Sequence, residues 1–172
     1  MREIKLTQGK VALVDDEDYE RLNRYRWCAF RNLNTYYASR SISGSATISM
    51  HRQILSVSPG KEIDHKDGNG LNNQKDNLRS CTHSQNCANQ RSQVNVSSKF
   101  KGVFWETGRR KWNASIGVAG QRMHLGRFKT EKAAALVYNV AAINHFGEFA
   151  RLNIVNQVSR EDISEKLKEL GL

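Results

Sequence analysis

Four side chains between residues 64 and 86 have the types and the spacing needed to cleave a phosphodiester. The run EIDHKDGNGLNN at 62–73 carries an adjacent acid and imidazole, and two asparagines follow in NLR at 77–79 and TxxxN at 82–86. Mg²⁺ prefers oxygen ligands and usually takes only one or two protein groups, leaving the rest to phosphate and water. A neutral imidazole can accept a proton from water near its ordinary pKa of about 6.5. The residues concerned are Asp64, His65, Asn77 and Asn86.

A strand, a turn, a second strand and a helix are predicted to position these side chains. In so small a unit the end of the first strand lies opposite the first turns of the helix, so Asp64 and Asn86 are expected to share one cation. His65, the next residue on the strand, projects to the opposite face by alternation. Thr82 is the expected N-cap of the helix. The predicted elements are KEIDHK at 61–66, the turn DGNGLNNQ at 67–74, DNLRS at 76–80 and THSQNCANQR at 82–91.

Residues 1–55 are predicted to form short strands and helices that flank this motif. IKLTQGKVALV alternates around a turn at Gln8-Gly9, and the acidic residues 15–18 open a helix through YERLNRYRW. TYYASRSI and ATISMHRQIL are predicted strands, the second passing into a helix near His51 that Pro59-Gly60 ends. This part is expected to flank the metal site and to widen the contact with DNA.

A second unit is predicted at 97–154. SKFKGVFW, KWNASIGV and QRMHLGRF are expected strands, and TEKAAALVYNVAAINHFG is an alanine-rich helix capped by Thr130 and closed by Gly147. A tail helix is predicted in SREDISEKLKELG, where Ser159 and Asp162 form a capping box. The apolar positions expected on one face of the alanine-rich helix are Ala134, Val137, Ala141 and His145.

Composition favours a polyanionic partner. The formal net charge is +10 over 172 residues, although a merely basic protein would show the same value. The odd cysteine count, without a CxxC pair, argues against a disulfide framework. No apolar run approaches the roughly 20 residues of a membrane span. The opening residues MREIKLTQGK contain no signal-peptide apolar region, so a cytoplasmic location is expected.

The spacing of DHKDGNGLNN, NLR and TxxxN resembles that of HNH endonucleases, especially the phage and intron-encoded homing members. The resemblance implies a ββα-metal fold, in which Asp64 is the first metal ligand and His65 the general base. Asn77 matches the central asparagine that braces the hairpin. Asn86 matches the last position of the motif, where this subgroup carries asparagine instead of histidine.

The sequence also contains candidate ligands for zinc and for phosphate. Many HNH proteins hold a structural zinc with two CxxC pairs, which this chain lacks, so no structural zinc is expected. Cys81, His83 and Cys87 cluster in the sequence, but their irregular spacing favours buried thiols over a zinc site. His83 is also a candidate contact to metal or phosphate, and Arg52 and Arg79 are candidate phosphate clamps.

The second unit resembles the plant ethylene-response-factor (Apetala-two type) DNA-binding domain over nearly 60 residues. That resemblance implies a three-stranded antiparallel sheet packed on one helix, with the sheet in the major groove of DNA. Arginines of the plant domain are replaced at Phe104, Glu106 and Gly117, so the base sequence read is expected to differ. The matching landmarks are Gly102-Val103, Lys111-Trp112, Ala114, Ile116, Leu125-Gly126, Phe128, Thr130, Ala133-Ala134, Tyr138, Ala141-Ala142, Gly147, Ala150 and Asn153.

The charges of the second unit support DNA binding independently. Residues 97–129 hold eight Lys or Arg against one acid, Glu106. Phosphate contacts of this kind make affinity fall steeply with salt, and they position a protein without specifying a base sequence. Trp112, Ile116 and Phe128 are expected in the core. The predicted DNA contacts are Lys99, Lys101, Trp105, Arg109, Arg110, Lys111, Arg122, His124 and Arg127.

These patterns predict an α+β chain in three parts: a nuclease domain at 1–95 with its motif at 61–95, a DNA-binding domain at 96–155, and a C-terminal helix at 156–172. The expected activity is hydrolysis of double-stranded DNA with one Mg²⁺ or Mn²⁺. One active site per chain predicts nicking by a monomer, and a double-strand break would need a dimer or two sequential events. The alternatives are a DNA-binding regulator with a silent nuclease site and an RNA-directed nuclease, which the absence of an RNA-stacking motif disfavours.

Overall fold

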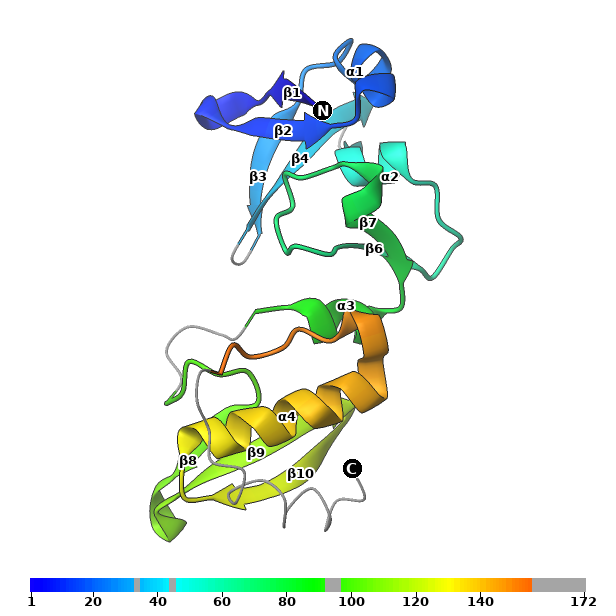
Figure 1. The fold of residues 1–172 in the computed structure, drawn as a ribbon. Helices are drawn as coiled ribbons and strands as arrows, with labels where there is room; N and C mark the ends of the chain where they lie inside the picture. The colour runs from blue at the N-terminus through cyan, green and yellow to red at the C-terminus, as the bar shows by residue number, and fades with distance from the viewer. Residues whose placement is uncertain (33–34, 44–45, 92–96, 156–172) are drawn as a thin grey trace. The chain divides into compact units, whose positions relative to one another are not determined.

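The structure, a computed structural model, describes residues 1–32, 35–43, 46–91 and 97–155 (Figure 1). It divides into two compact units, Met1–Asn86 and Cys87–Leu172. The mixture of helices with several small antiparallel sheets confirms the α+β class. The predicted tail helix at 156–172 lies outside the described residues. None of the helices in the described ranges has the length and apolarity to cross a membrane.

The first unit opens with a hairpin of β1 (Arg2–Lys5) and β2 (Val11–Val14). The intervening turn places Gln8 at φ 61° and Gly9 at φ 64°, where the left-handed backbone reverses the chain. The turn predicted at Gln8-Gly9 is therefore confirmed. Ile4 and Val14 point from this hairpin into the core of the unit.

The first helix is shorter than predicted. α1 (Asp16–Leu22) ends at Leu22, so the predicted extension through Trp27 is wrong. Trp27 is buried, its indole N–H donates to the carbonyl of Leu22 at 2.9 Å, and it forms a β-bridge with Leu6. The gain from burying this large ring outweighs the local helix signal, because tertiary packing overrides weak propensities.

A three-stranded antiparallel sheet follows, in the order β3-β4-β5. β3 (Cys28–Asn32) was not predicted, whereas β4 (Thr35–Ser43) and β5 (Ala46–Ser49) lie where expected. α2 (Met50–Ile54) begins beside His51 as predicted but ends before Pro59, and Met50 is fully buried.

The motif forms β6 (Glu62–His65), β7 (Leu78–Cys81) and α3 (His83–Asn89), with β6 and β7 antiparallel. Thr82 caps α3 as predicted, because its hydroxyl accepts the amide of Gln85 at 3.3 Å. The Gln85 side chain accepts the amide of Thr82 in return at 2.8 Å, which completes a capping box.

The second unit holds β8 (Val103–Glu106), β9 (Lys111–Val118) and β10 (Gln121–Phe128), with β9 central, and α4 (Glu131–Phe146) lies along this sheet (Figure 1). Ala134, Val137 and Ala141 are buried against it, and these small side chains let the helix approach closely. Thr130 caps α4 and Gly147 closes it, as predicted, but His145 is exposed. Four 3₁₀ turns in the described ranges are Thr7–Gly9, Lys75–Asn77, Thr107–Arg109 and Gly147–Phe149.

Candidate active site and nucleic-acid interface

Asp64 lies on β6 directly opposite Arg79 on β7. Its Oδ2 atom accepts hydrogen bonds from Nε of Arg79 at 2.9 Å and from Nη2 at 2.8 Å. Asp64 is buried and the Arg79 side chain is only 12% exposed. Arg79, a candidate phosphate clamp, is therefore engaged with the predicted metal ligand in this state.

His65 is buried at the end of β6, among two other rings. The ring of Tyr37 lies 5.6 Å and that of His51 lies 5.2 Å from the imidazole, centroid to centroid. Burial lowers the pKa of His65 below its ordinary value, while a hydrogen bond with Asn73 and the charge of Asp67 act in the opposite direction. The imidazole is therefore neutral at pH 7, which is the form that can accept a proton.

Asn77 ties the two ends of the loop that follows His65. Its Oδ1 accepts the amide of Asp67 at 3.1 Å, and its Nδ2 donates to the Asp67 carboxylate at 3.1 Å and to the carbonyl of Asn72 at 2.8 Å. The Asp67 carboxylate also accepts the amide of Asn69 at 2.7 Å. The side chain of Asn77 thus acts on loop geometry.

Glu62 connects β6 to α3 and was missed by the sequence reasoning. Its carboxylate accepts Nδ2 of Asn86 at 2.6 Å and lies 2.8 Å from Nδ1 of His83. The hydrogen bond from Asn86 is the main cause that lowers the pKa of Glu62, and the charge of exposed Arg52 contributes. The available signal was its place two residues before Asp64 on the same strand.

The oxygen donors on this side of the hairpin fit a hard divalent cation. Glu62 and Asp64 share one face of β6 by alternation, and the hydrogen bond to Glu62 holds the Asn86 carboxamide beside that face. Carboxylate and amide oxygens are the groups that Mg²⁺ prefers. In the part of the chain that the structure describes, no three His, Cys, Asp or Glu side chains gather as a metal group. Asn86, phosphate and water would therefore have to complete the coordination.

The Cys81 thiol beside the motif is buried and protonated. Cys81 is buried opposite Glu62 on the hairpin. Burial, with the charges of Asp64 and Glu62, raises the pKa of Cys81 to about 11. A protonated thiol is a poor metal ligand and a poor nucleophile.

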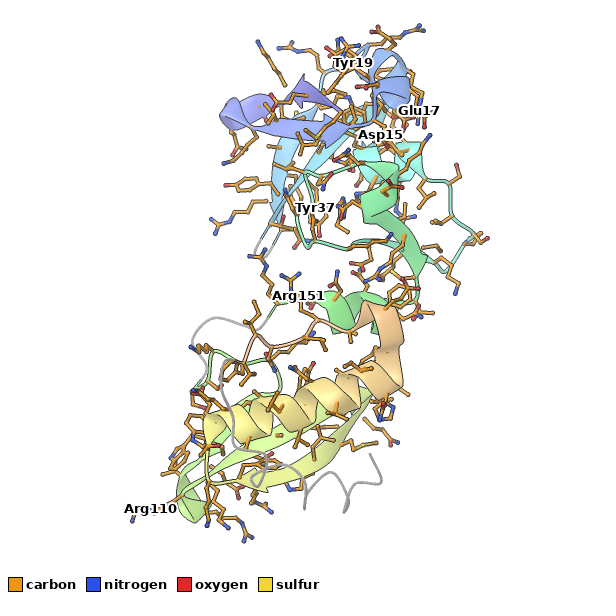
Figure 2. All side chains as sticks on the ribbon, in the orientation of Figure 1. Asp15, Glu17, Tyr19, Tyr37, Arg110 and Arg151 are labelled. Atoms are coloured by element: carbon orange, nitrogen blue, oxygen red, sulfur yellow. The ribbon has the colours of Figure 1, made fainter. Side chains whose placement is uncertain are left out.

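The N-terminal strands hold the loop between β6 and β7 in place. The amide of Leu13 on β2 donates to the carbonyl of Leu71 at 2.8 Å, and the amide of Asn73 donates to the carbonyl of Leu13 at 2.8 Å. Asp15, labelled in Figure 2 at the start of α1, accepts the amide of Lys75 at 2.8 Å. These contacts join residues that lie far apart in the sequence, so no local pattern could indicate them.

His51 is expected to make the first unit sensitive to acid. Burial, and then the charges of His65 and Arg52, lower the pKa of His51 to about 3. An unfolded histidine takes up a proton near pH 6.5. The contribution of neutral His51 to the free energy of unfolding is therefore fully present above pH 6.5, and it falls by up to about 1.4 kcal/mol per pH unit as pH decreases towards 3. Urea unfolding at pH 7, 6 and 5 should show this loss, and His51→Phe should reduce it. His145→Phe, at an exposed position of the second unit, is the matched control.

The outer face of the β8-β9-β10 sheet carries a polar network. Glu106 accepts Nε of Arg127 at 2.6 Å and Nδ2 of Asn113 at 3.2 Å, and it pairs with Arg109 at 3.1 Å. Nδ1 of His124 lies 3.2 Å from Oδ1 of Asn113. The single acid of this region therefore orients two of the predicted DNA-contacting arginines.

The remaining predicted contacts fall into two groups. Lys111 and Arg122 share the outer face by register, Lys99 is exposed, and Arg110 stands in the turn before β9 (Figure 2). Trp105 instead pairs with Trp112, on the side facing α4, at a ring distance of 5.1 Å. Ile116 and Phe128 are buried as predicted, with Trp112 packed against the same core.

Lys101 was predicted to contact DNA, but its side chain binds backbone carbonyl groups of the protein. Its ammonium group donates to the carbonyls of Cys87 at 3.0 Å, Ala88 at 2.6 Å and Gln90 at 2.8 Å. Burial, together with the charge of Arg151, lowers the pKa of Lys101 to about 8. The Lys101 side chain therefore caps the C-terminal end of α3 and does not extend towards a phosphate.

Lys101→Met is accordingly expected to lower stability by about 2 kcal/mol, because charge-assisted hydrogen bonds are lost. The slope of log Kd for DNA against log salt should stay unchanged. In contrast, Arg122→Ala, at an exposed position of β10, should reduce that slope by about one phosphate contact with little loss of stability. For both variants, filter binding over a salt series measures the slope, and urea unfolding measures the stability. A reduced slope for Lys101→Met without a change in stability would contradict this assignment.

Comparison with known proteins shows which proteins this chain resembles. A sequence model described as HNH endonuclease matches residues 57–88. An uncharacterized HNH endonuclease of Acanthamoeba polyphaga mimivirus is 30% identical over 155 residues, which cover 87% of this chain and 78% of that protein. Protein 3.8 of Escherichia phage T7 is 30% identical over 95 residues, 55% of this chain and 78% of the phage protein. No solved structure matches the chain.

Proposed function

This chain belongs to the HNH endonuclease family, and on that premise we propose that it is a metal-dependent endonuclease that cuts double-stranded DNA with its first unit and binds DNA with its second. The observation that carries the proposal is the buried, neutral imidazole of His65 next to Asp64, on a hairpin whose loop Asn77 closes. A polyanionic substrate agrees with the net charge of +10.

In the proposed mechanism, His65 takes a proton from water as the water oxygen attacks phosphorus in line. The bond from phosphorus to the 3′ oxygen breaks, water protonates that oxygen, and a 5′ phosphate remains. Asp64 and Asn86 would hold one Mg²⁺ or Mn²⁺, which when bound supplies positive charge to the phosphate and to the departing 3′ oxygen. Asn77 keeps the loop after His65 in one conformation.

Three further side chains are proposed to contact the phosphate backbone. Arg52 is exposed on α2 and its charge reaches Glu62, so it is well placed to meet a phosphate near the metal ligands. Arg79 would exchange part of its pairing with Asp64 for a phosphate oxygen. His83 is 81% exposed and lies against Glu62, at the start of α3.

The second unit is proposed to tether the nuclease to its target through the outer face of the β8-β9-β10 sheet. A second binding module raises the local concentration of DNA at the first. The network around Glu106 occupies side chains that would otherwise read bases, so a large part of the affinity should come from phosphates. A homing-type enzyme is proposed from the resemblance of the motif, and the two relatives come from a virus and a phage.

A supercoiled-plasmid assay tests the proposal. The chain with Mg²⁺ should convert supercoiled DNA to the nicked form, and EDTA should abolish the conversion. A linear product at early times would instead indicate paired active sites, and preferred cleavage of single-stranded RNA in competition would change the substrate class. Salt-sensitive DNA binding without cleavage of plasmids that carry candidate target sites would favour a silent DNA-binding regulator.

A further inference from the structure

We propose that Tyr37 and His51 are positioning residues that hold the imidazole of His65 in the orientation needed to take a proton from water. The inference rests on the proposed function of His65 as general base. Neither ring belongs to the motif at 62–86: Tyr37 comes from β4 and His51 from α2. The first 55 residues would thus supply part of the active site.

The three rings touch one another edge to face. The centroids of Tyr37 and His51 lie 5.8 Å apart with an interplanar angle of 73°, those of Tyr37 and His65 5.6 Å apart at 65°, and those of His51 and His65 5.2 Å apart at 86°. Offset and perpendicular arrangements are the favourable ones for aromatic pairs. Every ring in the cluster therefore has its plane defined by the other two.

Such a constraint matters for a histidine in particular. The torsion that rotates an imidazole about its bond to Cβ has broad minima, so the ring plane is poorly defined unless packing defines it. A base must direct its lone pair at the water proton, and an error of about 1 Å in such placement can cost roughly 10²-fold in rate. Two perpendicular neighbours limit this rotation.

The loop after His65 supports Tyr37 from outside the cluster. A Cβ at Gly70 would lie 2.5 Å from the carbonyl oxygen of Tyr36 and 2.6 Å from Cε1 of Tyr37, closer than real Cβ contacts. The amide of Gly70 donates to the Thr35 hydroxyl at 3.0 Å. The loop can approach β4 this closely because a glycine stands there, so Tyr37 lies against that loop as well as against the two histidine rings.

Both supporting rings are uncharged in the folded chain. Burial, with the nearby charge of Asp64, raises the pKa of Tyr37, so its phenol stays protonated. His51 is neutral at pH 7 because its pKa lies at about 3. The two rings therefore act on His65 by shape and not by adding charge, and a phenylalanine ring should do the same work at either position.

The test compares variants that keep or remove each ring. Tyr37→Leu and His51→Leu remove a ring, Tyr37→Phe and His51→Phe keep one, and Tyr36→Leu removes a ring from the same strand on its other face. The rate constant and KM are measured on nicked-plasmid formation at saturating Mg²⁺. The side-chain ¹⁵N signals of His65 are recorded by NMR in the metal-free protein. These signals report how well ordered the imidazole ring is, independently of catalytic activity.

Each leucine variant should lower kcat by roughly 10- to 100-fold with KM for DNA unchanged, and should shift or broaden the His65 signals. The phenylalanine variants should restore both readouts, and Tyr36→Leu should change stability alone. Wild-type kcat and unaltered His65 signals in both leucine variants would overturn the positioning role, while an inactive His65→Ala would leave the general base intact. Full cleavage by His65→Ala would overturn the proposed function and this inference with it.

Discussion

Replacing His65 by alanine is expected to lower the rate of plasmid nicking by roughly 10²- to 10⁴-fold, the usual contribution of a general base. The imidazole is buried, and burial lowers its pKa, so at pH 7 the wild-type chain carries the proton-accepting form. Alanine offers no acceptor at this position. The variant should still bind DNA, because the proposed tether lies in the second unit.

Single-turnover cleavage, measured beside a gel-retardation titration, separates chemistry from binding. His65→Asn keeps a polar side chain of smaller reach and should be as slow as the alanine variant. His145→Ala, which removes an exposed histidine from the end of α4, is the matched control and should cleave like wild type. A His65→Ala chain that cleaves at the wild-type rate would show that another group accepts the proton.

Asp64→Ala is expected to remove cleavage and to destabilise the first unit at the same time. Loss of a metal ligand should slow the reaction by about a thousandfold, since a bound cation supplies several kcal/mol of charge stabilisation. The largely buried guanidinium of Arg79 also loses the carboxylate that accepts two of its N–H groups. Breaking a buried ion pair by removing one partner costs about 3 kcal/mol.

The double variant Asp64→Ala with Arg79→Met separates these two effects. Methionine fills much of the volume of the arginine stem without a buried charge, so urea unfolding should return close to the wild-type midpoint. Cleavage should remain absent in the double variant. If cleavage returned together with stability, Asp64 would be a structural partner of Arg79 and not a metal ligand.

The motif elements could be predicted because their signals are local. The dense run of turn formers after Lys66 marks the end of β6 and predicts the reversal to β7. Thr82 ahead of a polar run predicts the start of α3. In the second unit the spacing of Ala134, Val137 and Ala141 predicts the buried face of α4, although the same period wrongly included His145.

The surroundings of the motif could not be predicted, since they depend on contacts between distant residues. Tyr37 and His51 reach His65 only through the packing of β4 and α2, and no spacing connects their positions with the motif. Lys101 has the residue type of a phosphate contact, and only the fold shows that three backbone carbonyls occupy it. Charge indicates a kind of partner but does not say which of several acceptors a given lysine will meet.

The hydrogen bonds of Leu13 limit which segments of such a gene can be exchanged by recombination. Its amide donates to the carbonyl of Leu71 and its carbonyl accepts the amide of Asn73, so the loop after His65 is held by the strand on which Leu13 lies. A recombination event that moved only residues 57–88 would carry the proposed catalytic side chains and leave this strand behind. The smallest transplantable nuclease is therefore expected to be the whole of Met1–Asn86, and a chimera with breakpoints closer to the motif would need a recipient that already offers an equivalent strand.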